Sequence, residues 1–366
     1  MESTSCNEKM KNWFKKYFLQ GQFVDDKLQA KMDNLPEKPS LYQLITIKYR
    51  KYLAVFIPLA LVQSIWWSTA IHYNFFRMTS EGSGAVAFPV MTLALHLDPD
   101  IARDFSLMIQ SIGTTSALVC TVLMRVSFEW RAVIFGCIGA FPGFIIGVHY
   151  IDPLFTGEEK KMLFVSIWTA FAFALAILNS QKKRKTLDEI HDFSLWKALV
   201  LIFVGVIGGI FDAFAGSGID ICIFSVTTIL FRVSEKIVTP TTVILKGIVS
   251  VYGFYYRSVM MGDIDDVAWK YFACSIPVSS AAAPIGSFLG SHLHRQVVAF
   301  FVYILEAVAL AGFLASKPPF TLIWIGALIM AGGFVFFLVL SKAGKMLLDR
   351  IEEEEEEEEK NEKLPL

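Results

Sequence analysis

The chain has 366 residues, of which 54% are hydrophobic and 18% are charged. Soluble domains rarely exceed about half apolar residues, so this composition excludes an ordinary soluble protein. The formal net charge of −1 combines two opposed ends: a lysine-rich stretch over residues 1–51 and an unbroken run from Glu352 to Glu359. An apolar body with charges at its ends and in short loops is typical of a multi-pass membrane protein.

Residues 1–51 are predicted to form a cytosolic N-terminal arm. The start of the chain is polar and holds no apolar stretch of signal-peptide length, so the first membrane helix is expected to direct insertion. Residues 10–32 can form an amphipathic helix, with two readings: a helix on the lipid surface or an ordinary packing helix.

Apolar segments follow in two groups, and most reach the roughly 20 residues that span a bilayer. Residues 52–180 form the first predicted membrane repeat, and residues 197–341 form the second with an extra C-terminal helix. A basic linker, residues 181–196, separates them, and residues 342–366 form a charged tail that is expected to be disordered. The sequence predicts an all-α polytopic membrane protein with about 9–11 membrane helices.

Basic clusters bear on the orientation of these helices. They lie before Tyr52, at Lys182 to Lys185, and at Lys342, Lys345 and Arg350. The positive-inside rule places all of them in the cytosol, which requires an even number of crossings in each half. Counting the short apolar segments as full spans gives five and six crossings, and counting them as re-entrant gives four and five. Both counts break the rule in one half, so the topology stays open.

Two short apolar segments, 84–97 and 218–231, each begin at a Gly-Ser-Gly, and these triplets lie 134 residues apart. The following segments match at a shift of 136, where four polar positions share one helix face by their spacing. The matches are Arg103 with Thr239, Ser106 with Thr242, Gln110 with Lys246 and Thr114 with Ser250. Further on, Gly143 and Gly147 match Gly286 and Gly290. The sequence thus predicts two pseudo-symmetric repeats, each with a broken helix.

The glycine triplets have two physical interpretations. Unwound backbone survives in a membrane only where it is buried in protein or lines a wet cavity, and a helix that restarts there aims free N–H groups at a ligand. Two such breaks would build an anion site. The alternative is that the glycines allow close packing of helices.

Longer motifs carry a family resemblance. The second half contains Gly216-Ser217-Gly218-Ile219-Asp220, Phe231-Arg232-Val233, Glu235-Lys236, Thr239-Pro240-Thr241-Thr242 and Gly253-Phe254-Tyr255-Tyr256-Arg257; the first contains residues 84–92 and 102–111. These stretches resemble the TauE/SafE sulfite-exporter family, also called the 4-toluene sulfonate uptake permease family, and look closest to its eukaryotic branch. The similarity covers about residues 82–295. Many members carry a further glycine where this chain has Ile219. The resemblance implies a carrier of sulfite, sulfonates or related organosulfur anions.

The expected substrate-binding residues lie at the two breaks and on the matched helix faces. They are Gly82, Ser83, Gly84, Ser106, Gln110, Gly216, Ser217, Gly218, Thr242, Lys246 and Ser250. Lys246 stands out because ionisable side chains inside a span are costly and usually mark a pathway. Its ammonium either pairs with a bound anion or neutralises a buried carboxylate.

Three further residues are candidates for coupling or gating. Glu306 would partner Lys246 or carry a proton, or only make a hydrogen bond between helices. Asp220 would bind a proton or cap the restarted helix. Arg103 would attract anions or anchor to lipid headgroups. Arg257, at a segment end, is expected at the membrane interface.

Other classes of function fit less well. Ile219 separates Gly218 from Asp220, so the Gly-x-Gly-Asp of intramembrane aspartyl proteases is missing, and Ala215 breaks the rhomboid Gly-x-Ser-Gly. No ATP-binding motif, cofactor or metal site is predicted, and nucleic-acid binding has no support. The protein is therefore expected to be a non-enzyme of the plasma membrane or an organelle membrane. Its expected partners are a small anion and lipids, and the sequence is compatible with a homo-oligomer and with a basic partner for the acidic tail. An anion channel and a membrane receptor stay as alternatives.

Overall fold

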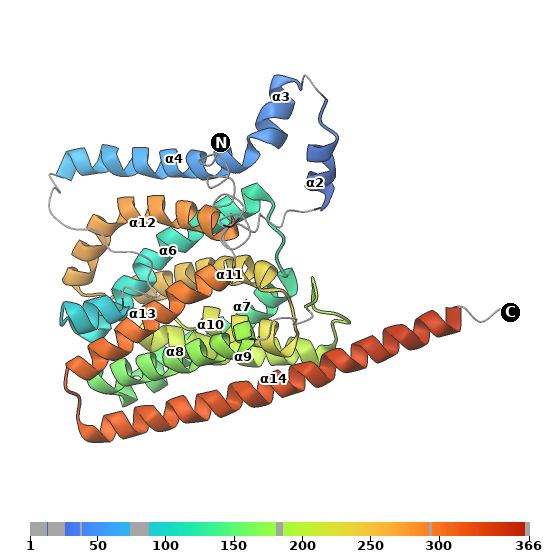
Figure 1. Cartoon of the computed structure of the whole chain (residues 1–366). Coiled ribbons are helices and arrows are strands. Elements are labelled where there is room, and N and C mark those ends of the chain that lie inside the picture. The colour runs from blue at the N-terminus through green and yellow to red at the C-terminus, as the bar shows by residue number, and fades with distance from the viewer. Residues whose placement is uncertain are drawn as a thin grey trace, which may run out of the picture.

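The computed structural model describes residues 13, 26–36, 39–73, 88–180, 186–292 and 295–362. Within these ranges the chain is mainly helical, and an isolated strand-like bridge joins Leu187 to Val233. Six of the described helices are long and apolar enough to cross a membrane. The prediction of an all-α polytopic membrane protein is confirmed, and Figure 1 shows these helices stacked as one bundle.

Within the described ranges the bundle is built from ten α-helices, several of which end in a π-helical turn. The helices are α4 (Arg50–Tyr73), α6 (Pro99–Met124), α7 (Trp130–Ile146), α8 (Gly157–Ser180), α9 (Leu195–Ala215), α10 (Ile219–Ser225), α11 (Glu235–Tyr255), α12 (Asp266–His292), α13 (Arg295–Ala315) and α14 (Phe320–Glu362). The π turns are η2 (Val90–Ala94), η3 (Gly147–Ile151), η5 (Val226–Leu230) and η6 (Tyr256–Met261), and η4 (Asp152–Leu154) is a 3-10 turn. The short helices α2 (Asp26–Asp33) and α3 (Leu41–Gln43) and the π turn η1 (Leu44–Lys48) precede them.

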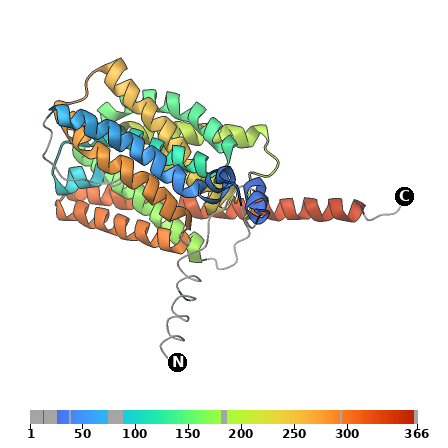
Figure 2. The ribbon, with the colours of Figure 1, turned by 90° about the horizontal axis from the view of Figure 1, so that it is seen from above.

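Helices α6 and α11 form the centre of the bundle and run antiparallel. Asp104, near the start of α6, binds Arg257 just after the end of α11, while Gly247 in mid-α11 lies against Thr114. Helices α4 and α12 pack on α6, and α8 packs on α13 and α14 (Figure 2). The central pair thus contains both polar helix faces that the sequence matches at a shift of 136.

Helices α7 and α9 are held together by glycines. A Cβ atom added at Gly139 or at Gly143 would collide with the backbone of α9, and one at Gly209 would collide with the backbone of α7. Small residues allow helix backbones to approach this closely in membranes. For these glycines the packing interpretation describes the structure.

Helices α9 and α10 form a hairpin that enters and leaves the bundle at one end. Leu187, before α9, bridges Val233, after α10, and the rings of Trp196 and Phe231 pack at a centroid distance of 5.9 Å. The turn between the two helices, Gly216 to Gly218, lies inside the bundle.

The segments that flank the basic clusters lie at that same end of the bundle. The contacts that place them there are Arg50 with Leu123, Glu129 with Ile190 and Thr241, Leu187 with Val233, and Arg232 with Ser341. Helix α9 is one of the six described helices long and apolar enough to cross a membrane, and α10 with η5 brings the chain back to the end where α9 begins (Figure 1).

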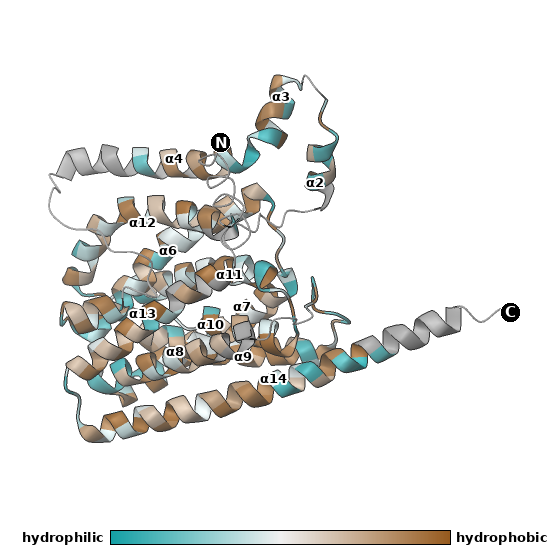
Figure 3. Ribbon diagram, viewed as in Figure 1, coloured by the Kyte–Doolittle hydropathy of each residue, from teal (hydrophilic) through white to brown (hydrophobic). Residues whose placement is uncertain are grey.

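Helix α14 continues beyond the bundle. Its first part is hydrophobic, and its projecting part becomes hydrophilic (Figure 3). The structure gives residues 342–362 as helix, where the sequence predicts a disordered tail. Glutamate is a good helix former, and this segment extends a helix that is already nucleated, so propagation costs little.

Candidate functional site

The second Gly-Ser-Gly breaks the chain between α9 and α10. Gly216 has φ of +69°, a left-handed conformation that side chains disfavour. A Cβ atom at Gly216 would also lie 2.7 Å from the Cβ of Ser106, and one at Gly218 would collide with Phe211. Both conformation and space therefore demand glycine at Gly216, and space demands it at Gly218.

The carbonyl of Gly216 is the meeting point of the two central helices. It accepts a hydrogen bond from the Gln110 amide of α6 and another from the Lys246 ammonium of α11, the latter at 3.0 Å. Gln110 also donates to the Ser106 hydroxyl at 3.0 Å. Gln110 and Lys246, which the sequence matches at a shift of 136, thus converge on one buried backbone oxygen.

Lys246 also forms a buried ion pair with Asp212 of α9. Its Nζ lies 2.8 Å from Asp212 Oδ1, and the two side chains are 3% and 0% exposed. The N–H of Ile219, at the start of α10, donates to the same Oδ1 at 3.2 Å. Asp212 Oδ2 has no hydrogen-bond partner among the described residues.

Sequence reasoning missed Asp212. It allowed that Lys246 neutralises a buried carboxylate, but it proposed Glu306 as that partner. The structure places Asp212 there instead. The available signal was an aspartate inside the apolar stretch from Ile210 to Phe214, because an ionisable residue in a span is unusual in itself.

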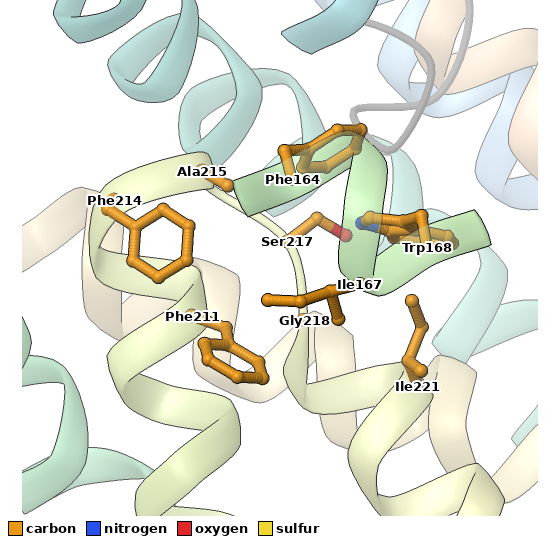
Figure 4. Close-up of a pocket in the computed structure, with 9 residues that line it drawn as sticks. All are labelled: Phe164, Ile167, Trp168, Phe211, Phe214, Ala215, Ser217, Gly218 and Ile221. Carbon is orange, nitrogen blue, oxygen red and sulfur yellow. The ribbon is translucent and has the colours of Figure 1, made fainter. Parts of the chain in front are cut away.

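Two buried hydroxyls beside this pair lack partners within the described residues. They belong to Ser217, in the break, and Ser250, one turn along α11 from Lys246. Ser217 lies on the wall of a narrow pocket beside the break (Figure 4). The pocket is lined by Phe164, Ile167, Trp168, Phe211, Phe214, Ala215, Ser217, Gly218 and Ile221.

The other predicted site residues differ in their contacts. Thr242 donates to the Thr239 carbonyl of its own helix at 3.0 Å. Asp220 accepts from the N–H of Gly218 at 3.1 Å, which is a capping contact at the start of α10. Glu306, on α13, is buried, and its Oε2 has no partner among the described residues.

Arg103 belongs to a network of ion pairs at the opposite end of the bundle. It binds Asp104 at 3.0 Å and Asp152 at 2.6 Å. Arg257 holds both oxygens of Asp104, at 3.0 and 2.9 Å, and Lys160 bridges Asp152 at 2.8 Å and Asp100 at 2.7 Å. The side chain of Arg257, which the sequence places at the membrane interface, is buried and paired across two helices at this end of the bundle.

The first Gly-Ser-Gly, with Gly82, Ser83 and Gly84, lies outside the described residues. The structure therefore presents one half of the predicted pair of breaks, together with both polar helix faces.

Comparison with known proteins gives one match. The family described as Sulfite exporter TauE/SafE matches residues 75–313, well over half of the chain. Comparison with curated proteins gives no significant match, and neither does comparison with solved structures. The matched region contains the α9–α10 break, the central helices α6 and α11 and the Arg103 network. The chain, a multi-pass membrane protein with a polar site at a helix break, belongs to the TauE/SafE sulfite exporter family of membrane transporters.

Proposed function

We propose that this protein is a secondary transporter that exports a small anion, sulfite or an organosulfur acid, by alternating access. The observation that carries the proposal is the buried Lys246 ammonium beside a helix break, with two unpartnered hydroxyls next to it. Buried polar groups are normally hydrogen-bonded. Two buried hydroxyls without a described hydrogen-bond partner, next to a helix break in a member of a transporter family, therefore favour a ligand site.

The anion would be held at the Gly216–Gly218 break. Lys246 supplies the positive charge, Ser217 and Ser250 supply hydroxyl donors, and the Gln110 amide lies within the same cluster. Ser106 and Thr242 complete the lining on the two central helices. Gly82, Ser83 and Gly84 would contribute the symmetric break from the first half.

Two inverted repeats would supply the machinery for alternating access, and matched hydrogen bonds support them. At a shift of 136 residues, Thr92 and Thr228 donate to Phe88 and Phe224, and the amides of Leu97 and Val233 donate to Met91 and Thr227. Two positive-φ residues, His96 and Arg232, fall in the same register. The matched helices α6 and α11 run in opposite directions, as inverted repeats require.

The Arg103 network would act as a gate at one end of the pathway. It joins the starts of α6 and α8 to η6 at the end of α11, so relative motion of these elements must break its ion pairs. One residue links gate and site directly, because the Arg103 carbonyl lies against Gly216. Proton coupling through Glu306 or Asp220 belongs to the same proposal.

Flux measured in proteoliposomes tests this function. We expect saturable flux of sulfite, sulfoacetate or taurine, and a loss of at least about tenfold in Lys246→Met, since removing the cation removes the charge partner of the anion. Lys345→Met, at an exposed position of α14, is the matched control and should transport normally. Flux without saturation would identify a channel instead, and no flux of any of these solutes would favour the receptor alternative.

A further inference from the structure

Asp212 is the described carboxylate that pairs with Lys246. Its Oδ1 accepts from the Lys246 ammonium and from the Ile219 N–H, while its Oδ2 accepts from no described residue. The side chain is completely buried. From this geometry, and resting on the proposed function, we infer that Asp212 carries the proton that is transported with the anion.

The inference follows from charge balance. Lys246 and Asp212 together are neutral, and a buried net charge is costly in a membrane interior. Adding a monovalent anion to this pair leaves one uncompensated negative charge. A proton that arrives with the anion and bonds to Asp212 Oδ2 removes the carboxylate charge. Lys246 keeps its own proton and pairs with the anion, so the occupied site is neutral again.

The other two carboxylates are less suited to this role. No contact joins Glu306 to Lys246 within the described residues, so a proton on Glu306 leaves the partner of Lys246 unchanged. Asp220 caps its own helix through Gly218. Asp212 alone touches both the ammonium and the start of α10.

The surroundings of Asp212 limit which other groups respond to pH. Lys246 of α11 and Asp220 of α10 act on it electrostatically, and Cys222 of α10 lies in the field of both aspartates. From α6 the same cluster receives the amide of Gln110, which does not titrate. Helix α9 packs against α7 through glycine and backbone, which carry no charge.

Protonation of Asp212 would also reach the hairpin. The Ile219 N–H is the first helical donor of α10, and a neutral carboxyl accepts a weaker hydrogen bond than a carboxylate. Phe211 and Phe214, which flank Asp212 in sequence, line the same pocket as Ser217. Charge neutralisation at one atom is thereby connected to the start of α10 and to the pocket wall.

Asp212→Asn tests the inference, because asparagine keeps the shape and imitates the protonated acid. Two assays are run on the reconstituted full chain: sulfite exchange at equal pH on both sides, and sulfite accumulation driven by a pH gradient. We expect exchange to persist and gradient-driven accumulation to fall to the level of empty liposomes. Asp188→Asn, an exposed acid of the linker, is the control and should retain both activities.

The outcomes separate the inference from the function on which it rests. Gradient-driven accumulation in Asp212→Asn equal to wild type would overturn the proton-carrier role, and so would loss of both activities in a folded variant. No exchange in the wild type would instead reject the proposed function. If the variant fails to fold, the test is methanesulfonate binding to the wild-type protein, because this anion stays ionised. We expect the protein to take up about one proton for each anion that binds. Binding without proton uptake would overturn the inference.

Discussion

Two groups of buried charges differ in how completely they are paired. In the Arg103 network three cations meet four carboxylates, and Arg257 holds both oxygens of Asp104. At the Lys246–Asp212 pair one carboxylate oxygen and two nearby hydroxyls have no partner in the described structure. Buried ions are stable when their donors and acceptors are used. In the first group even Asp152 Oδ1, which makes no hydrogen bond to a described residue, lies 2.8 Å from Lys160 Nζ in an ion pair, so we treat this group as a lock and the second as a site.

The largest effect should come from the glycine that positions the pair. Gly216→Val adds a β-branched side chain at φ of +69°, against Ser106, and should abolish transport and lower the yield of folded protein. Gly286→Val is the control, because a Cβ atom at Gly286 meets nothing within 4 Å. Size-exclusion profiles and sulfite flux measure both effects. Normal flux in Gly216→Val would refute the helix break as the organising feature.

Removing a cation from the saturated network should mainly affect stability. Arg257→Met leaves Asp104 without its bidentate partner, and breaking a buried pair costs about 3–5 kcal/mol. Asp263→Asn, at the half-exposed rim of the network, should cost under about 1 kcal/mol. Thermal unfolding in detergent compares them. Equal shifts in melting temperature for the two variants would contradict the distinction between the buried ion pairs of the network and its half-exposed edge.

Variants of the Lys246–Asp212 pair should affect stability and transport differently. Lys246→Met leaves Asp212 buried and unpaired, so we expect a loss of stability as well as of flux. Adding Asp212→Asn to Lys246→Met should recover most of the stability without restoring flux, since the buried charge disappears while the anion still lacks its cation. Recovery of flux in the double variant would remove Lys246 from the substrate site.

The smallest effect should come from removing the hydroxyls of Ser217 and Ser250, which have no partner among the described residues. Ser217→Ala and Ser250→Ala should leave stability within about 1 kcal/mol of wild type and weaken anion affinity by up to about tenfold, since each hydroxyl is expected to bond only the anion. Ser258→Ala, whose hydroxyl donates to its own helix, is the matched control. An affinity unchanged in both site variants would place the anion elsewhere.

Much of the architecture follows from local patterns. Long apolar segments predict membrane helices, because an unpaired backbone cannot survive in lipid, and the spacing of Gln110 and Lys246 predicts that each lies on the polar face of its helix. The glycine triplet predicts the break at Gly216, which requires a left-handed backbone. Each of these features depends on a few consecutive residues.

The partners of the buried charges could not be predicted in the same way. Arg257 pairs with Asp104, which lies 153 residues earlier, and Lys246 pairs with Asp212 of another helix. A single sequence carries no register between such distant segments. Position at a segment end therefore suggested an interfacial Arg257, whereas its ion pair with Asp104 depends on the contact of two distant helices.

The glycine contacts between α7 and α9 have a mechanical consequence. Two backbones in direct contact cannot slide past each other without collision, so α9 is fixed to α7 as a single stiff unit. The break at Gly216 is carried at the end of that unit, while Gln110 and Lys246 approach it from the central helices. The pair α7–α9 thus forms a rigid scaffold, and the central helices α6 and α11 can move relative to it.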